Sequence, residues 1–589
     1  MALKTNATGG QATDPNPLRA GFAGLLAGAA ALSVGELAGA VAAPRPGPVV
    51  AVANRVVDKA PSWFVDFGKA VFSLNDKPAL VLGTVIISLL FAIGLGIASI
   101  RRPMVGIAGI IVFGLIGLLS IATDSQGTFG HALWISALAV GAGIATLLWL
   151  LDKAYPNGRS QTTTIPLSES TQADDANEIE KLGFPSDRND EEPGDGSDEE
   201  PTGDETPNAE LVGVGSVTDS PTDPSVSRRG FLNAAGLVTV GAAASSVGAN
   251  FLRSQSSATQ ARNNVAIQTP DGVTIPSGVD ATGATVVNEG VAATPNITPL
   301  FVPNDKFYRI DTAILTPQVD PADWTLRITG MVDQELTLTF EELQERASEV
   351  KPVTLSCVSN EVGGTLVGNA LWQGVPLVEL LDEAGVQEGA TQIASRSVDG
   401  WTCGFPTAAA YDGRTAMVAI AMNNEPLPLE HGFPARLVVS GLYGYVSATK
   451  WLAEIGLTTL EGFEGYWIPR GWSKLGPIKT QSRIDTPGHG STFTAGQKVP
   501  IAGVAWAPDT GIEAVEVQID DGEWMEAELG ESLGPDAWVQ WVLPWEANQG
   551  RHDIRVRATD TTGETQTPDR AAPAPNGASG WHTVAVSVT

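Results

Sequence analysis

The stretch Val353-Thr-Leu-Ser-Cys-Val-Ser-Asn-Glu-Val-Gly-Gly364 contains Cys357, one of only two cysteines in 589 residues. Its first three residues are typical of a short strand, and its Ser-Asn and Gly-Gly pairs are typical of a loop. The thiol is therefore expected where a strand ends. At such a position a thiolate can be a soft ligand for a transition metal or a nucleophile. The alternative is a small buried hydrophobic residue.

Short motifs surround this stretch, in this order: Asn304 with Phe307-Tyr308, Gly374-Val-Pro-Leu377, Pro428-Leu-Glu-His-Gly-Phe-Pro-Ala-Arg436, Lys450-Trp451 and Gly465-Tyr-Trp467. Together with the Cys357 loop they resemble the sulfite oxidase family of molybdopterin enzymes, from about residue 300 to the C-terminus. The resemblance implies a mixed α+β domain that binds Mo-molybdopterin. It also implies that Cys357 is the catalytic residue and the one protein ligand of molybdenum.

The same resemblance implies the residues that contact or orient the cofactor. The loop around Cys357 would be oriented by Ser356, Ser359 and Asn360. The pterin and its phosphate require cations and polar groups, and the matching positions are Asn304, Phe307, Tyr308, His431, Arg436 and Lys450. Without the resemblance, Arg436 would be interpreted as a charge at a strand end and Lys450 as a solvated side chain.

The expected reaction is a two-electron oxygen atom transfer on a small oxyanion such as sulfite. Two positions depart from sulfite oxidases proper: Pro303 replaces an arginine that helps to hold the oxyanion, and Asp305 replaces a histidine. The related methionine sulfoxide reductase branch also has Asn and Phe-Tyr in this segment, so sulfoxide reduction stays open. An anion pocket could draw on Arg309, Arg396 and Arg470.

Composition limits the other functional classes. Asp and Glu number 66 against 35 Lys and Arg, a net charge of −31. This charge argues against nucleic-acid binding and is typical of proteins from high-salt organisms. No haem, flavin, iron–sulfur or nucleotide motif is found, so the electrons are expected to pass to a separate carrier. A rival hypothesis is a non-enzymatic surface binding protein in which Cys357 is structural.

Residues 1–152 are expected to form a four-helix membrane unit. Apolar runs near the ~20 residues that a membrane-crossing helix requires occur at about 18–43, 79–100, 105–122 and 131–151. Between the first two runs, residues 49–72 resemble an interfacial amphipathic helix. Arg101, Arg102, Lys153 and Arg159 flank the spans, whereas residues 123–130 contain no basic residue. Both ends of this unit are therefore expected in the cytoplasm. The basic residues of the first loop argue against this orientation.

Residues 153–226 are predicted to be a disordered acidic linker, because they are rich in Asp, Glu, Ser, Pro and Gly. The linker ends at Ser227-Arg-Arg-Gly-Phe-Leu232, which matches a twin-arginine export signal, and residues 227–252 are expected to include a fifth transmembrane segment. A tether at 253–295 would follow. These features predict a multi-pass protein of the cell membrane, with the catalytic domain on the extracytoplasmic side.

The remaining chain is divided into a catalytic domain at 296–475 and a C-terminal domain at 476–589. In the first, strands are expected at 323–330, 335–340, 392–397, 417–422 and 436–439, with helices at 340–350 and 376–384. In the second, alternating segments at 501–506, 514–519, 523–528, 538–543, 552–558 and 582–588 predict an immunoglobulin-like sandwich. It resembles the family's dimerisation domain, so a homodimer is possible. Cys403 is expected to be a buried free thiol rather than a disulfide partner of Cys357.

Overall fold

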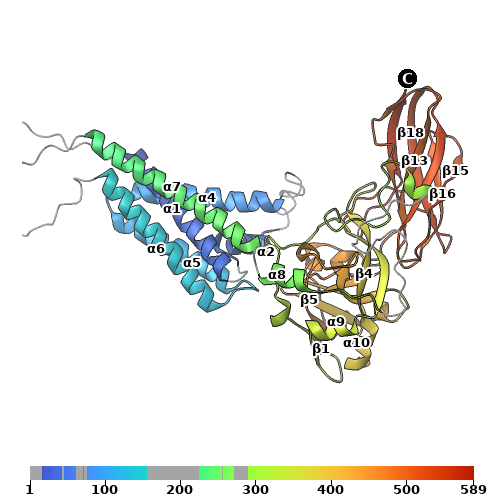
Figure 1. Ribbon diagram of the computed structural model, residues 1–589, viewed down its shortest axis with the longest axis horizontal. Helices are drawn as coiled ribbons and strands as arrows, with labels where there is room; N and C mark the ends of the chain where they lie inside the picture. Colours follow the sequence, from blue (N-terminus) through green and yellow to red (C-terminus); the bar gives the residue numbers. More distant parts are fainter. Residues whose placement is uncertain are drawn as a thin grey trace, which may run out of the picture.

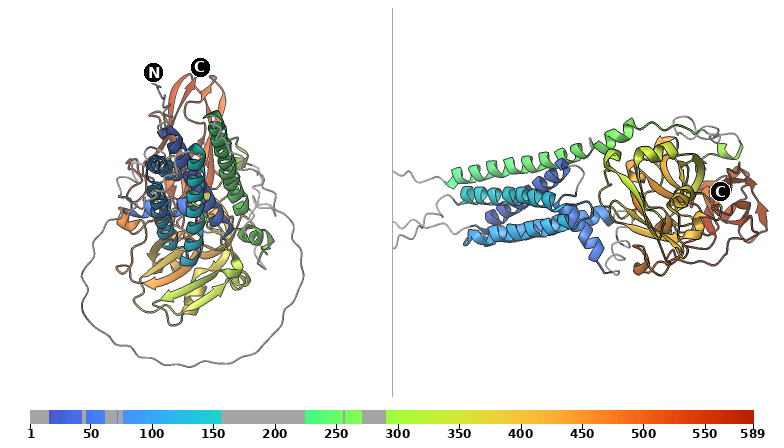
Figure 2. Two further views of the ribbon diagram at one scale, coloured as in Figure 1. Left: turned by 90° about the vertical axis from the view of Figure 1, so that its left-hand side faces the viewer. Right: turned by 90° about the horizontal axis from the view of Figure 1, so that it is seen from below.

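The computed structural model describes residues 16–42, 46–61, 71, 76–155, 224–254, 257–270 and 290–589. Helices form the N-terminal part, a mixed α/β domain follows, and the C-terminal part is rich in β-strands (Figure 1). The helices stand at one end of the α/β domain, as the right-hand view of Figure 2 also shows. Most of the expected acidic linker, at 156–223, and much of the tether, at 271–289, lie outside the described residues.

Among the described residues of the N-terminal part, four helices are long and apolar enough to cross a membrane: α1 (Pro17–Val41), α4 (Asp76–Ala98), α5 (Pro103–Ala122) and α6 (Phe129–Ala154). Their bounds agree with the four apolar runs of the sequence. The shorter helix α2 (Pro48–Lys59) covers part of the expected interfacial segment, while residues 62–70 and 72–75 of that segment lie outside the described residues.

Helix α7 (Pro224–Ser254) packs along α1, where the Phe22 and Phe231 rings lie 6.2 Å apart. Its apolar part, Gly230–Ser245, is shorter than the four candidate spans, so a fifth transmembrane segment stays a prediction. The Tyr155 hydroxyl donates a hydrogen bond to the Asn16 carbonyl at 2.6 Å. The start of α1, the end of α6 and the first half of α7 therefore share one end of the bundle. The loop between α5 and α6 lies at the other end, against the α/β domain (Figure 1).

The α/β domain contains two sheets. The first has the strand order β2 (Leu336–Thr339), β1 (Thr325–Gly330), β10 (Leu452–Thr458), β5 (Gln392–Ser397), β6 (Thr402–Pro406). Only β1 and β10 are parallel, in the register Arg327 to Glu454, and the other neighbours are antiparallel. The strands expected at 323–330, 335–340 and 392–397 are all found in this sheet.

The second sheet is antiparallel and carries the strand that leads to Cys357. Its order is β3 (Glu349–Ser356), β4 (Val367–Pro376), β7 (Ala416–Met422), β8 (Glu425–Pro426), and β9 (Arg436–Val439) also pairs with β7. Helix α9 (Phe340–Arg346) begins at Thr339, whose side chain and that of Glu342 form a capping box. The helix expected at 340–350 was too long, because residues 349 and 350 already pair with β4.

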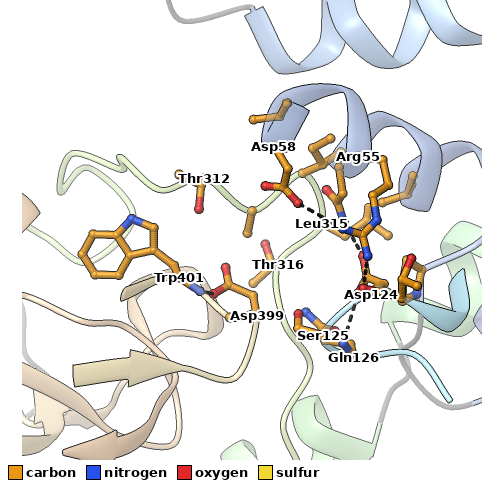
Figure 3. Close-up of a pocket in the computed structure, with 18 of the residues that line it drawn as sticks. Arg55, Asp58, Asp124, Ser125, Gln126, Thr312, Leu315, Thr316, Asp399 and Trp401 are labelled. Carbon is orange, nitrogen blue, oxygen red and sulfur yellow. Dashed lines mark hydrogen bonds and ion pairs between the residues drawn. The ribbon is translucent and has the colours of Figure 1, made fainter. Parts of the chain in front are cut away.

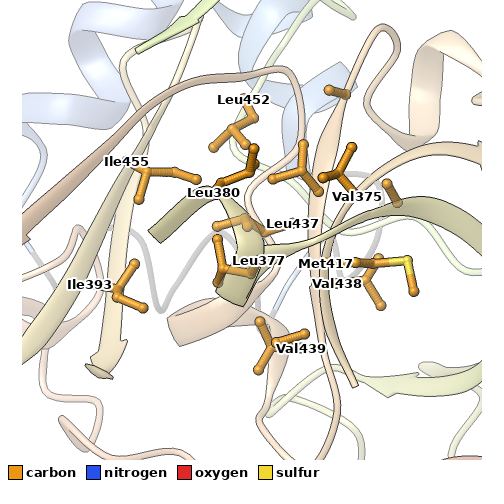
Figure 4. Packing of buried hydrophobic residues seen from close by; sticks show 14 of the residues in the cluster. Val375, Leu377, Leu380, Ile393, Met417, Leu437, Val438, Val439, Leu452 and Ile455 are labelled. Atoms are coloured by element: carbon orange, nitrogen blue, oxygen red, sulfur yellow. The ribbon is translucent and has the colours of Figure 1, made fainter. Parts of the chain in front are cut away.

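The core of this domain lies between the two sheets and is filled in part by helix α10 (Leu377–Ala384). Its leucines, Leu377, Leu380 and Leu381, lie on one face of the helix, and all of them are buried. Figure 4 shows Leu377 and Leu380 between Ile393 of the first sheet and Met417 of the second. Burial of such leucines stabilises the fold by about 2 kcal/mol for each side chain.

The C-terminal part has two sheets that pack around a common core. One has the order β11 (Gln481–Thr486), β13 (Lys498–Trp506), β17 (Val539–Glu546), β16 (Glu528–Leu529). The other has the order β12 (Thr492–Phe493), β19 (His582–Val588), β18 (Gly550–Asp560), β14 (Ile512–Ile519), β15 (Trp524–Glu526). The single strand expected at 523–528 was wrong, because this segment forms two short strands, β15 and β16, in different sheets. Ala527, between them, is buried. The immunoglobulin-like class stays a prediction.

The C-terminal part forms hydrogen bonds with β3, the edge strand that leads to the Cys357 loop. The Trp538 backbone N–H donates to the Thr354 hydroxyl at 2.7 Å, and its indole N–H donates to the Leu300 carbonyl at 2.8 Å. The Thr354 backbone N–H donates in turn to the Asp536 carbonyl at 2.9 Å. These buried bonds replace the missing neighbour of β3 and fix the strand that precedes Cys357.

Candidate functional site

Cys357 is the first residue after β3, and its side chain is almost fully buried. The Ser359 backbone N–H points at the Cys357 sulfur from 3.4 Å. The Asn360 side chain closes the loop by accepting a hydrogen bond from the Leu366 backbone N–H at 2.8 Å. Ser356 is buried and its hydroxyl lies 3.4 Å from the Cys357 carbonyl. The expected strand end is confirmed, and the loop is held by its own polar groups.

The segment with Asn304, Phe307 and Tyr308 lies beside His431. The Phe307 ring stacks on Tyr308 at 5.2 Å and meets the edge of His431 at 5.5 Å. His431 Nε2 donates to the Asn304 carbonyl at 3.0 Å. Two stretches 127 residues apart in sequence are thereby joined.

The Asn304 side chain is engaged within the protein by a residue that sequence reasoning missed. Its oxygen accepts from the Asn423 amide at 2.9 Å, and its own amide donates to the Met422 carbonyl at 3.2 Å. Asn423 is buried, has φ +51°, and also binds the Leu371 backbone N–H and the Val302 carbonyl, each at 2.9 Å. The pair Asn423-Asn424 after a strand is a turn signal, and it could have indicated that Asn423 forms these hydrogen bonds, which we call the Asn423 brace.

Arg436, at the start of β9, is a buried cation without a carboxylate at ion-pair distance in the described chain. Its guanidinium donates to the His431 carbonyl at 3.1 Å and lies 4.9 Å from the centre of the Trp372 ring. Burial lowers the pKa of Arg436 to about 10, against a smaller opposing effect of Tyr308. A buried and unneutralised guanidinium favours an anionic ligand.

Lys450 is also buried, and its ammonium group binds Asp311 at 2.7 Å and the Glu430 carbonyl at 3.0 Å. Asp311 was not expected from the sequence. Its carboxylate also accepts from Lys77 at 2.7 Å and from Arg309 at 2.9 Å. Burial lowers the pKa of Lys450 to about 8, although Asp311 opposes this change. Three cations thus share one buried carboxylate.

Gly432 brings the two cationic motifs together. It has φ +111°, and a Cβ at this position would lie 3.0 Å from Lys450 Cα and 3.1 Å from Arg436 Cβ. Any other residue would have a strained backbone, and its Cβ would press against both segments. The motif His-Gly-Phe-Pro-Ala-Arg therefore needs its glycine so that the segment carrying Lys450 can approach Arg436.

The electrostatics of the site keep two neutral groups beside these cations. Burial, then Lys450 and Arg436, lower the pKa of His431 to about 3, so the imidazole is uncharged at neutral pH. Burial, then the neighbouring Cys357, raise the pKa of the Tyr308 phenol, which Arg436 only partly offsets. Tyr308 therefore remains a proton donor near the thiol at neutral pH.

The three arginines considered for an anion pocket are separated by the fold. Arg309 lies at the Asp311 cluster. Arg396 extends from β5 toward Glu454 at 3.7 Å and is half exposed, and Arg470 stacks on the Tyr466 ring at 3.7 Å. Of the three, Arg309 is therefore the one that lies beside Lys450.

These residues fit the cofactor that the resemblance implies. Cys357 supplies a soft sulfur ligand at a braced strand end. Arg436 and Lys450 are buried, and Lys77 and Arg309 stand beside them, each about one-third exposed. In the described chain, the carboxylates that face these four cations are Asp311 and, 3.8 Å from Arg309, the exposed Glu430. This surplus suits a phosphate dianion such as that of molybdopterin.

Comparisons with known proteins support a molybdopterin-binding domain in this part of the chain. Residues 313–467 match the family model described as the oxidoreductase molybdopterin binding domain. Mitochondrial sulfite oxidase of Rattus norvegicus is 30% identical over 325 residues, which are 46% of this chain and 59% of that protein. The uncharacterized oxidoreductase YuiH of Bacillus subtilis is 34% identical over 157 residues, 27% of this chain and 76% of YuiH. The chain belongs to the sulfite oxidase family.

As a member of the sulfite oxidase family, the chain is a molybdopterin-dependent oxidoreductase with Mo-molybdopterin as its cofactor. It spans 59% of the length of the rat sulfite oxidase that it matches. Among solved structures it is similar to the sulfane dehydrogenase SoxCD of Paracoccus pantotrophus, with 24% identity and a TM-score of 0.42, over 55% of this chain and 89% of that one.

Proposed function

We propose that this chain is a membrane-anchored oxidoreductase that carries out two-electron oxygen atom transfer on a small oxyanion such as sulfite. The observation that supports it most is the pair of buried cations Arg436 and Lys450, which face one buried carboxylate, that of Asp311. A site of this charge attracts anions, and burial strengthens the attraction by excluding water. The sulfite oxidases among its relatives support an oxidoreductase over a non-enzymatic binding protein.

Each residue of the site has a proposed part. Cys357 would bind molybdenum through sulfur, and Arg436 and Lys450 would hold the pterin phosphate. The bound cofactor supplies a metal that exchanges one oxygen atom and accepts two electrons. Arg309, about one-third exposed and next to Lys450, would orient an incoming oxyanion, and the protonated Tyr308 phenol would donate a hydrogen bond near the thiol.

A second candidate is sulfoxide reduction. Pro303 stands where sulfite oxidases proper have an arginine for the substrate, and the neighbouring Asn304 with Phe307-Tyr308 resembles the sulfoxide reductase branch. A neutral sulfoxide would depend less on the arginine that is missing here. The same cofactor and cysteine would serve both directions of transfer.

The decisive experiment compares the two directions in one preparation. The full chain would be purified in detergent from a host that makes the cofactor, and its molybdenum would be measured by elemental analysis. We expect stoichiometric molybdenum and sulfite-dependent reduction of ferricyanide, with little oxidation of reduced viologen by methionine sulfoxide. The opposite ranking would favour the reductase. Full molybdenum loading without turnover of either substrate would contradict the proposal.

We also propose that the catalytic domain lies outside the cytoplasm. In support, the α5–α6 loop, which contains no basic residue, approaches Gly400 of that domain, while both ends of the acidic linker belong to the opposite end of the bundle. Protease added to intact cells should therefore release the region after Arg253 and spare residues 155–226. Cleavage within 155–226 alone would overturn this orientation.

A further inference from the structure

A cavity of about 500 Å³ lies where the helical bundle meets the catalytic domain (Figure 3). One wall is formed by α2 and the loop between α5 and α6. The other wall is formed by residues 312–316, Gln318, residues 399–401 and Tyr466. The volume is in the usual range for small-molecule sites, and neither Cys357 nor the proposed phosphate-binding residues line it.

The cavity shares a wall with the proposed cofactor site. Thr312 lines the cavity and directly follows Asp311, which binds Lys450 at 2.7 Å. On a second segment of this wall, the turn after β5, the Val398 backbone N–H donates to the Trp451 carbonyl at 2.8 Å, and Trp451 directly follows Lys450. A single layer of chain therefore separates the cavity from Lys450, which is a short path for electrons.

The lining favours a neutral, amphipathic ring. Its charged groups are Arg55 against Asp58, Asp124 and Asp399, so the net charge is negative and disfavours phosphate headgroups. Figure 3 shows Asp399 and Thr316 facing Arg55, Asp124 and Gln126 across the space. Apolar and aromatic contacts come from side chains on both walls: Val50, Val57, Leu315, Trp401 and Tyr466.

The position of the cavity limits the source of such a ring. The α5–α6 loop connects two helices that are long and apolar enough to cross a membrane, so the cavity lies at one end of the candidate spans. A ligand with an apolar tail could reach it from a bilayer. Quinones combine a flat neutral ring, two carbonyl acceptors and such a tail.

We propose that this cavity binds the ring of a membrane quinone that exchanges electrons with the catalytic site. The inference rests on the proposed function. The overall reaction balances: the reduced substrate, one water and one quinone give the oxygenated product and one quinol. Both electrons and both protons therefore leave on the quinol. The reductive direction runs the same exchange in reverse.

Asp399 is placed to move one of these protons. It lines the cavity, and burial raises the pKa of its carboxyl, which Ser397 and the Trp401 backbone N–H only partly offset. A carboxyl with a raised pKa gives up and regains a proton more readily near neutral pH.

The test measures binding first, without turnover. The full chain in detergent would be titrated with decylubiquinone by calorimetry and photolabelled with an azido analogue, and the labelled peptides would be mapped. We expect labels on residues 46–58 or 312–318. Leu315→Trp should fill the cavity and weaken binding at least tenfold, and Gln126→Leu serves as a milder second variant. The exposed Leu475→Trp is the matched control.

Turnover then separates this proposal from the proposed function. In Leu315→Trp, the ratio of quinone-linked to ferricyanide-linked turnover should fall at least tenfold, whereas Leu475→Trp should keep the ratio. No quinone binding to the unaltered chain, labels only elsewhere, or equal binding by Leu315→Trp would overturn the quinone site. Ferricyanide-linked turnover reports on the proposed function alone, so the two failures are distinguishable.

Discussion

The Lys77 ammonium group lies 2.7 Å from the Asp311 carboxylate, and this ion pair joins the start of a candidate membrane helix to the catalytic domain. The Asp311 side chain is only 4% exposed, and it also binds Lys450. The helical unit therefore contributes to the charge balance of the proposed cofactor site. Packing of the helical unit against the catalytic domain and binding of the cofactor are therefore expected to influence each other through the Asp311 carboxylate.

Asp311→Asn should leave three cations without their shared counter-charge. Breaking a buried ion pair costs about 3 to 5 kcal/mol, because the remaining charge, here the ammonium group of the buried Lys450, stays desolvated. We expect a loss of about 3 kcal/mol in the urea unfolding of the catalytic domain, and Lys77→Met should cost less stability when combined with Asp311→Asn than it does alone. The exposed Asp323→Asn is the control. Additive effects of the Asp311 and Lys77 changes would contradict the shared role.

Acid should destabilise the domain partly through His431. Its pKa is lowered to about 3 by burial, Lys450 and Arg436, while an unfolded histidine titrates near 6.5. Its contribution is therefore fully present above about pH 6.5 and is lost as pH falls toward 3, at up to about 1.4 kcal/mol per pH unit. His431→Gln should flatten the fall in stability between pH 7 and 5, measured by urea unfolding.

His552 provides a control of opposite sign. The hydrogen bond to Asp520 raises the pKa of His552, so its contribution is present in acid and is lost as pH rises. His552→Gln should therefore steepen the loss of stability between pH 7 and 5. An unchanged slope in His431→Gln would show that folding does not shift the pKa of this imidazole.

Cys357→Ser should abolish turnover while the protein stays folded. A serine oxygen is a harder ligand than sulfur and changes the electronic properties of the metal. Cys403→Ser is the matched control, because the Cys403 thiol already contacts the Ser395 and Thr449 hydroxyls at 3.3 and 3.1 Å. The molybdenum spectrum and sulfite-linked turnover would be compared in both variants. Equal activity in both would refute the role of Cys357.

Arg436→Met should separate stability from cofactor binding. Because the buried guanidinium has no carboxylate partner in the described chain, its removal should leave the cofactor-free protein as stable as before or more stable by about 1 kcal/mol. Molybdenum content should fall at least tenfold. Arg327→Met, half exposed on β1, should keep its molybdenum. A large loss of stability in cofactor-free Arg436→Met would show a structural role instead.

The strands with strong local signals were predicted well. The strands at 392–397 and 436–439 were placed at their observed bounds, because alternating or continuous apolar residues with β-branched side chains specify a strand locally. Strand β4 (Val367–Pro376) was missed although it is the buried centre of the second sheet. Its Gly368 and Gly374 weaken the local signal, and both make room for close neighbours, the Phe307 ring and the β7 backbone.

The sequence by itself determined the cysteine at a strand end, the four apolar helices and, through ordered motifs, the family and its cofactor. Tertiary structure alone decided that Asp311 joins Lys77 and Lys450, which lie 234 and 139 residues away, and that Arg309 rather than Arg396 or Arg470 stands beside them. It also revealed the Asn423 brace. The physical reason is that strand and helix patterns are local, whereas the role of a charged or amide side chain depends on burial and on partners brought close by folding.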